Sequence, residues 1–137
     1  MRTIFAAIAL LALTAAQPAP RVPIEGYWKN PIGSAIIEIA RCDDSLCGKV
    51  VWASARGQRE ASTSTSHVVG TIVLTGLRPA RNRWTGTLFI PDDNVHVAAR
   101  LQLLGDRQLK LTGCAVAGFF CRSQIWTRSD QPLPSSG

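Results

Sequence analysis

Residues 95–104 read Val-His-Val-Ala-Ala-Arg-Leu-Gln-Leu-Leu and carry a clear structural signal. Apolar side chains occupy every second position from Val95 to Leu103, and the positions between them are polar or small. Such an alternation indicates a β-strand with one buried face and one solvated face. It does not suit an α-helix, whose apolar face repeats every three to four residues.

Similar short runs lie on both sides of this stretch and are separated by turn residues such as Pro91-Asp92-Asp93-Asn94. These runs cover residues 26–29, 34–41, 47–53, 68–75, 83–90, 108–113 and 122–128. Residues 54–67 are rich in Ser, Thr and Arg and are predicted to form the longest loop, and no helix is expected after residue 16. Eight short strands with mostly short connections predict an all-β fold, a small antiparallel eight-stranded up-and-down barrel. A half-open barrel or a sandwich is the alternative.

The first sixteen residues have the pattern of a cleaved secretory signal peptide. Arg2 precedes an apolar run at 4–13, and the small residues Thr14-Ala15-Ala16 then offer a cleavage site. A membrane anchor is the alternative, but ten apolar residues rise only ~15 Å as a helix, against a hydrocarbon core of about 30 Å. We therefore expect a secreted mature protein with no transmembrane segment. Its predicted parts are an extended lead-in (17–25), a single barrel domain (26–128) and a flexible tail (129–137).

Composition narrows the class of protein further. The chain has 137 residues, of which 15 are Lys or Arg, 9 are Asp or Glu, and 46% are hydrophobic. This length suits one domain, and the composition excludes a disordered or collagen-like chain. Loss of Arg2 with the signal peptide leaves 14 basic and 9 acidic residues, a net charge of +5. That charge favours anionic partners such as lipid headgroups or acidic glycans. The basic residues form no tight run, so we expect no nucleic-acid binding.

Four cysteines permit three disulfide pairings. Cys42–Cys47 and Cys114–Cys121 are favoured, because each pair flanks a short turn between two predicted strands. Facing residues of an antiparallel hairpin lie ~4.5–5.5 Å apart, a spacing that suits a disulfide. A zinc site built from all four thiolates is the alternative. It is disfavoured because the four- and six-residue gaps are wide for zinc and because secreted thiols oxidise.

The two ends of the predicted barrel carry a recognisable pattern. The first strand reads Gly26-Tyr27-Trp28 and the last reads Trp126-Thr127-Arg128. Together they resemble the lipocalin-type arrangement, in which a tryptophan closes the barrel floor beneath an arginine from the final strand. The resemblance assigns this closure to Trp28 and Arg128, and a guanidinium over an indole face contributes ~0.5–2 kcal/mol.

A closer resemblance covers nearly the whole mature chain. It is carried by Gly26-Tyr27-Trp28 with Pro31, Ile37-Glu38-Ile39 before Cys42, residues 46–52 (Leu-Cys-Gly-Lys-Val-Val-Trp), Trp84-Thr85-Gly86, Pro91, Leu109, Gly113 and residues 121–128 (Cys-Arg-Ser-Gln-Ile-Trp-Thr-Arg). In these blocks the chain resembles the domain of unknown function 2147 family of small secreted bacterial proteins. The resemblance implies a periplasmic, lipocalin-like barrel and no known reaction. The chain departs from the family pattern in two places. The turn at 91–94 stands where the family reads Pro-x-Asp-Gly, and the Ser/Thr/Arg loop at 55–66 replaces an acidic loop containing Asn-Pro.

Candidate functional residues are few, and no nucleophile elbow, phosphate-binding loop or metal-ligand motif is present. We therefore assign no catalytic residue, no cofactor and no metal. Ligand-binding candidates are Glu38, Trp52, Trp84, His96, Arg100, Phe119 and Phe120. Glu38 points opposite to Ile37 and Ile39 and faces either the lumen or the solvent. The aromatic residues either line a cavity or fill the interior, and a filled lumen is favoured for so small a barrel.

Three functions follow from these observations. The first is a binding module for a small apolar or lipid-like ligand, and the alternative is an envelope interaction protein that uses its basic outer surface and loops. A hydrolase or isomerase built on Glu38, His96 and Arg100 is less favoured. We expect the protein to be a monomer.

Overall fold

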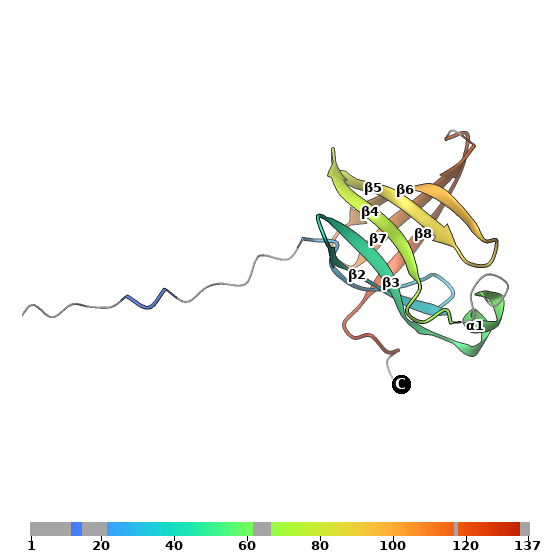
Figure 1. Cartoon of the computed structure of the whole chain (residues 1–137), viewed down its shortest axis with the longest axis horizontal. Helices are drawn as coiled ribbons and strands as arrows, with labels where there is room; N and C mark the ends of the chain where they lie inside the picture. Colours follow the sequence, from blue (N-terminus) through green and yellow to red (C-terminus); the bar gives the residue numbers. More distant parts are fainter. Residues whose placement is uncertain (1–11, 15–21, 62–66, 117, 135–137) are drawn as a thin grey trace, which may run out of the picture.

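The computed structural model describes residues 12–14, 22–61, 67–116 and 118–134. Eight antiparallel strands follow one another around a closed barrel, as Figure 1 shows. The strands are β1 (Gly26–Lys29), β2 (Ala35–Cys42), β3 (Ser45–Ala53), β4 (Ile72–Ala80), β5 (Arg83–Ile90), β6 (Val95–Leu104), β7 (Gln108–Ala115) and β8 (Phe120–Ser129). Residues 27–29 of β1 pair with residues 127–129 of β8 and close the barrel. The predicted up-and-down barrel is therefore confirmed, and the closed sheet excludes the half-open barrel and the sandwich.

A short helix, α1 (Ala55–Ala61), stands in the segment that the sequence predicts to be a loop. The Ser54 hydroxyl accepts a hydrogen bond from the Gly57 amide at 3.1 Å, which is an N-cap contact. Ala61 is buried at the other end of the helix. The expectation of no helix was wrong, because so short a helix depends on this cap and on packing, and neither gives an apolar repeat in the sequence. Residues 62–66 of the predicted loop lie outside the described residues, as does most of the predicted signal peptide.

Strand β4 begins at Ile72, four residues later than the predicted start at Val68, and it runs on to Ala80. Its register against β5 shifts between Thr75 and Arg78, around Gly76, which has a φ of +62°. A β-bulge of this kind interrupts the alternation of side chains. The sequence pattern therefore ends before the strand does.

The buried core lies inside the barrel and takes side chains from every strand except β5, whose Trp84 and Leu88 pack against it. In β6, Ala99 and Leu101 are buried while Arg100 between them is exposed, as the alternation predicts. The cluster consists of Ile24, Trp28, Ile37, Ile39, Leu46, Val50, Ala53, Val73, Leu74, Leu77, Ala99, Leu101, Leu109, Leu111 and Trp126. We call the end that contains Trp28 the floor of the barrel.

The floor is closed by a tryptophan and an arginine. The Arg128 guanidinium carbon lies 4.2 Å from the centre of the Trp28 ring. Trp28 is fully buried, and its indole nitrogen donates a hydrogen bond to the Ile24 carbonyl at 2.9 Å. Gly26 has a φ of +126°, and a Cβ atom there would lie 2.9 Å from Arg128 Nη1. Glycine is therefore required two residues before Trp28, both for its backbone angle and for the space that the guanidinium occupies.

Two disulfides tie neighbouring strands together. Cys42–Cys47 joins β2 to β3 across their turn, and Cys114–Cys121 joins β7 to β8. Both pairings match the prediction.

Within the described residues, no helix has the length and apolar character needed to cross a membrane.

Candidate ligand cavity

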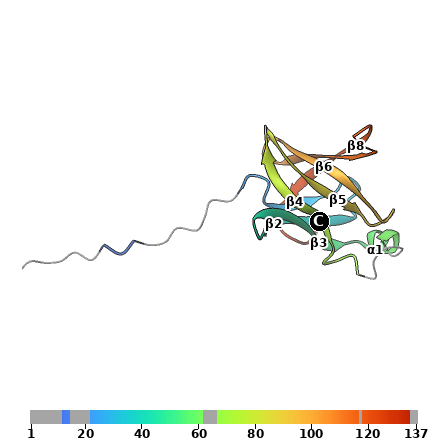
Figure 2. The same cartoon turned by 45° about the horizontal axis from the view of Figure 1, so that its top comes forward.

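A cavity of about 1030 Å³ occupies the end of the lumen opposite the floor. α1 and the turn between β5 and β6 lie at this end (Figure 2). Its apolar walls include Ile37, Val50, Val73, Leu88, Val97, Leu111 and Trp126. The volume is at the upper end of the usual range for small-molecule sites, about 300–1,000 Å³.

Small residues explain why this half of the barrel is hollow. Ala35, Ala53, Gly113 and Ala115 all line the cavity, Ala115 as an exposed residue at its rim, and larger side chains at these positions would take up part of its volume. The expectation of a filled lumen therefore holds only for the floor half. Because the composition of the chain as a whole is ordinary, the uneven distribution of small residues becomes visible only when the strands are placed.

Strand β8 contributes polar side chains to the cavity wall. Arg122 faces Gly113 across the β7–β8 pair, and Gln124 faces Leu111. Both line the cavity, together with Trp126 two residues further on. The Trp126 indole nitrogen donates a hydrogen bond to Gln124 Oε1 at 3.1 Å. Among the described residues, Arg122 has no ion-pair partner.

Acidic side chains lie at another part of the cavity rim. Glu60 comes from α1, and Asp92 and Asp93 come from the turn between β5 and β6. Burial raises the pKa of Asp92, and the negative charges of Glu60 and Asp93 raise it further. Arg56 Nε contacts Glu60 Oε1 at 2.7 Å, and this hydrogen bond raises the pKa of Arg56. The rim therefore carries negative charge near α1 and a positive charge on β8.

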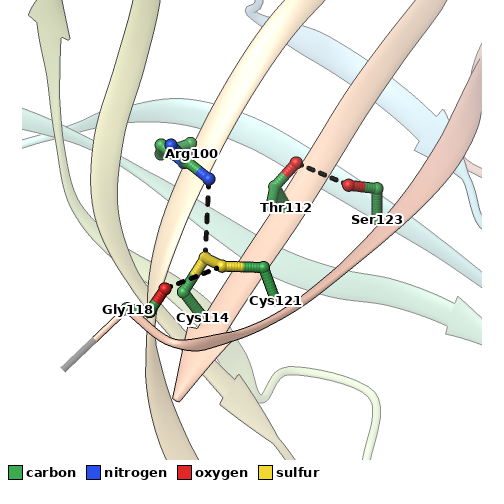
Figure 3. Close-up of a disulfide and its surroundings, with 6 residues drawn as sticks. All are labelled: Arg100, Thr112, Cys114, Gly118, Cys121 and Ser123. Carbon is green, nitrogen blue, oxygen red and sulfur yellow. Dashed lines mark hydrogen bonds between the residues drawn. A yellow bond between two sulfur atoms is a disulfide. The ribbon is translucent and has the colours of Figure 1, made fainter. Parts of the chain in front are cut away.

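Two exposed aromatic residues lie at the rim beside the second disulfide. Phe119 is 84% exposed and Phe120 is 69% exposed, and both line the cavity. Cys114–Cys121 closes the loop that carries Phe119, and Figure 3 shows its surroundings. Arg100 Nη2 donates a hydrogen bond to Cys114 Sγ at 3.5 Å. These aromatic side chains are therefore held at the cavity entrance by a cross-linked loop.

Three of the predicted site residues do not face the lumen. Glu38 points opposite to the core residues Ile37 and Ile39, and its cross-strand partners are Tyr27 and Lys49. His96 lies on the outer face of β6, where its ring stacks on Phe89 with centroids 4.8 Å apart, and Arg100 shares that face. β2 and β6 are not neighbours in the barrel. The structure therefore does not bring together Glu38, His96 and Arg100, the group on which the hydrolase or isomerase hypothesis depends.

The two predicted tryptophans also lie outside the large cavity. Trp52 faces Ile36 across the β2–β3 pair and does not line the cavity. Trp84 packs against the core and lines a second cavity of about 210 Å³ near the floor. Phe119 and Phe120 are thus the predicted ligand-binding residues that the structure places at the large cavity.

Sequence reasoning missed the polar residues of the cavity wall, Arg122 and Gln124. A signal for both was present, because they precede Trp126 at intervals of two and therefore share its face of the strand.

Within the described ranges, no three His, Cys, Asp or Glu side chains lie close enough together to hold a metal ion.

A closed eight-stranded barrel with a Trp–Arg floor and an open apolar end defines a lipocalin-like protein. The chain belongs to the bacterial family described as "Uncharacterized protein conserved in bacteria (DUF2147)", whose model matches residues 26–128, and this confirms the resemblance seen in the sequence. The structure is similar to protein HP1028 from the human pathogen Helicobacter pylori, which belongs to the lipocalin family. The TM-score is 0.61 and the identity 13%, over 80% of this chain and 86% of the other. At this identity the likeness shows the fold alone. No curated protein matches the chain.

Proposed function

We propose that the protein is a periplasmic binding protein that holds a small apolar or lipid-like ligand in the open half of its barrel. The observation that carries this proposal is the cavity of about 1030 Å³ with apolar walls. Transfer of an alkyl chain from water into such a cavity is favourable by about 0.8 kcal/mol per methylene group. The closed floor gives the ligand one entrance, at the end where Phe119 and Phe120 are exposed.

The periplasmic location rests on the N-terminal sequence and on the cysteines. Residues 1–16 have the pattern of a secretory signal peptide. The two disulfides are compatible with a secreted protein, since such bonds form and persist in oxidising compartments. Fractionation of cells that express the full chain tests the location. Recovery of the protein in the cytoplasm with an intact N-terminus would refute it.

Filling the cavity with a larger side chain tests ligand binding. Ala115 lines the cavity, whereas Ala98 is exposed on the outer face of the neighbouring strand. We expect N-phenyl-1-naphthylamine, a neutral apolar fluorophore, to bind the secreted protein saturably with one site. Ala115→Trp should weaken this binding at least roughly tenfold, because the indole occupies the space of the ligand. The matched variant Ala98→Trp should bind as the natural protein does.

Circular dichroism and urea unfolding confirm that both variants are folded before binding is compared. Equal binding by the two folded variants would show that the cavity is not the site. Absence of saturable binding to the natural protein, with this fluorophore and with hexadecanol, would refute the proposed function itself.

A further inference from the structure

Arg122 is the basic residue of the cavity wall. Among the described residues that line the cavity there is no Lys, no His and no other Arg. Alternation along β8 directs Arg122 to the same side as Trp126, and Ser123 lies on the other face, where its hydroxyl is 2.8 Å from that of Thr112. Arg122 is exposed, so the register of the strand places this residue on the wall of the cavity at its solvent-accessible end.

The strands beside Arg122 present apolar side chains of little bulk to it. Its cross-strand partner is Gly113, whose own partner on β6 is Ala99. A Cβ atom on Gly113 would lie 3.2 Å from Val97 Cγ2 and 3.5 Å from Leu88 Cδ2, so these apolar side chains pack over the glycine. A charged group beside such a wall is poorly solvated once a ligand excludes water. An ionic partner of opposite charge then contributes more than it would in bulk water.

Arg122 lacks such a partner in the described part of the chain. The acidic residues of the rim are Glu60, which contacts Arg56, and Asp92 and Asp93 of the β5–β6 turn. None of them forms an ion pair with Arg122 at 4.0 Å or less. Their negative charge repels an anion from the α1 side of the entrance and so favours its placement against β8.

Gln124 adds a second donor on the same face of β8. Its Oε1 atom already accepts the hydrogen bond from Trp126, and within the described residues its amide nitrogen has no acceptor. Residues two apart on a strand are about 7 Å apart, which lets both side chains contact one headgroup. Leu111, which faces Gln124 across the β7–β8 pair, and Val50 of β3 belong to the apolar wall of the same cavity.

From this placement we infer that the ligand is a single-chain amphiphile with an anionic headgroup, a carboxylate or a phosphate. Arg122 binds the headgroup oxygens, Gln124 donates a further hydrogen bond, and the alkyl chain extends toward Trp126. A guanidinium suits both headgroups, because its paired N–H donors match two oxygens of either group. This inference rests on the proposed function, since it specifies the ligand class of the same cavity.

Four ligands with the same hexadecyl chain provide the test: hexadecanoate, hexadecyl phosphate, hexadecanol and hexadecyltrimethylammonium. Each is titrated below its micelle concentration, by displacement of N-phenyl-1-naphthylamine. We expect the natural protein to bind at least one of the two anions about tenfold or more tightly than hexadecanol, as a charge-assisted bidentate contact would provide. Preference for one anion over the other identifies the headgroup as carboxylate or phosphate.

Arg122→Gln should remove the preference for anions and leave the affinity for hexadecanol unchanged. Arg122→Lys, which keeps the charge but loses the paired donors, should retain part of the preference. Arg100→Gln is the matched control, because Arg100 lies on the outer face of the barrel, and it should behave as the natural protein does. These comparisons separate the inference from loss of folding, since hexadecanol binding reports an intact cavity in every variant.

The outcomes that overturn the inference differ from those that overturn the proposed function. Equal binding of anions and hexadecanol, or anion binding unchanged by Arg122→Gln, would refute the role of Arg122 and leave a cavity for neutral ligands. Tightest binding of hexadecyltrimethylammonium would assign the headgroup site to the rim acids instead. Failure of all four ligands to bind would refute the proposed function as well.

Discussion

Arg128 links the two ends of the barrel domain with one side chain. Its guanidinium lies over Trp28 and donates hydrogen bonds to three carbonyl oxygens, those of Pro23, Glu25 and Asp106, at 2.8, 2.9 and 2.7 Å. Partial burial and the positive charge of Arg107 lower the pKa of Arg128. A lysine could keep the charge, but one ammonium group cannot reach three diverging acceptors while it covers an indole face.

We therefore expect Arg128→Lys to lower the free energy of unfolding by about 2 kcal/mol, through lost charged hydrogen bonds and lost stacking. Urea unfolding followed by tryptophan fluorescence measures the change. Arg81→Lys is the matched control, because Arg81 is exposed in the turn between β4 and β5, and its effect should stay within about 0.5 kcal/mol. Equal stability of the two variants would show that closure of the floor does not depend on the guanidinium.

At the scale of single residues, period-two patterns predict which side chains share a face but not which face is inside. The sequence places Glu38 opposite to Ile37 and Ile39, and the structure resolves this alternation with the two isoleucines in the core. The contact between Trp28 and Arg128 is different, because a recognisable pattern at both ends of the chain predicts it. Arg122 had only its spacing of four residues before Trp126 as a signal, and its place on the cavity wall depends on the pairing of β7 with β8.

At the scale of elements, the disulfides stabilise hairpins that are already paired. Cys114 and Cys121 face each other across β7 and β8, seven positions apart in sequence. Loop-closure entropy for so short a loop gives about 2.5 kcal/mol in the chain-entropy model. Replacement of both cysteines by serine should therefore lower the free energy of unfolding by about 2 kcal/mol.

Urea unfolding without reductant measures this loss. The Cys42→Ser, Cys47→Ser double variant is the comparison, and its loss should be similar, because its loop is slightly shorter. Addition of reductant should destabilise the natural protein more than either double variant. A double variant at Cys114 and Cys121 as stable as the natural protein would mean that the β7–β8 hairpin needs no cross-link.

Elements with a clean alternation could be predicted from the sequence, and irregular ones could not. β6 runs over the predicted residues 95–104 because no bulge or glycine interrupts it. α1 and β4 differ from the prediction for local reasons. α1 is a short helix that depends on the cap at Ser54, and β4 contains a bulge at Gly76. Caps and bulges act through one or two atoms, so they leave little trace in a hydropathy pattern.

At the scale of the whole molecule, the division of the lumen into a packed floor and an open end is a property of all strands together. The total number of apolar residues suits a packed small barrel. The cavity exists because small residues from three strands, Ala35, Ala53, Gly113 and Ala115, line the same end of the lumen. Composition could not predict this, since it does not record which residues become neighbours.

This division predicts a gradient of local stability along the barrel axis. Backbone amides near Trp28 and Leu109, which are buried and do not line the cavity, should exchange most slowly in hydrogen–deuterium exchange, because they open only on global unfolding. Amides at the open end, in 91–97 and 113–116, have fewer packed neighbours and should exchange faster. Binding of N-phenyl-1-naphthylamine should slow amide exchange at the open end. The exchange rates of the floor amides should change only by the amount that the overall gain in stability on binding explains. Protection confined to the floor would place the ligand elsewhere. A single measurement on the natural protein therefore tests whether the hollow half of the barrel is the half that binds.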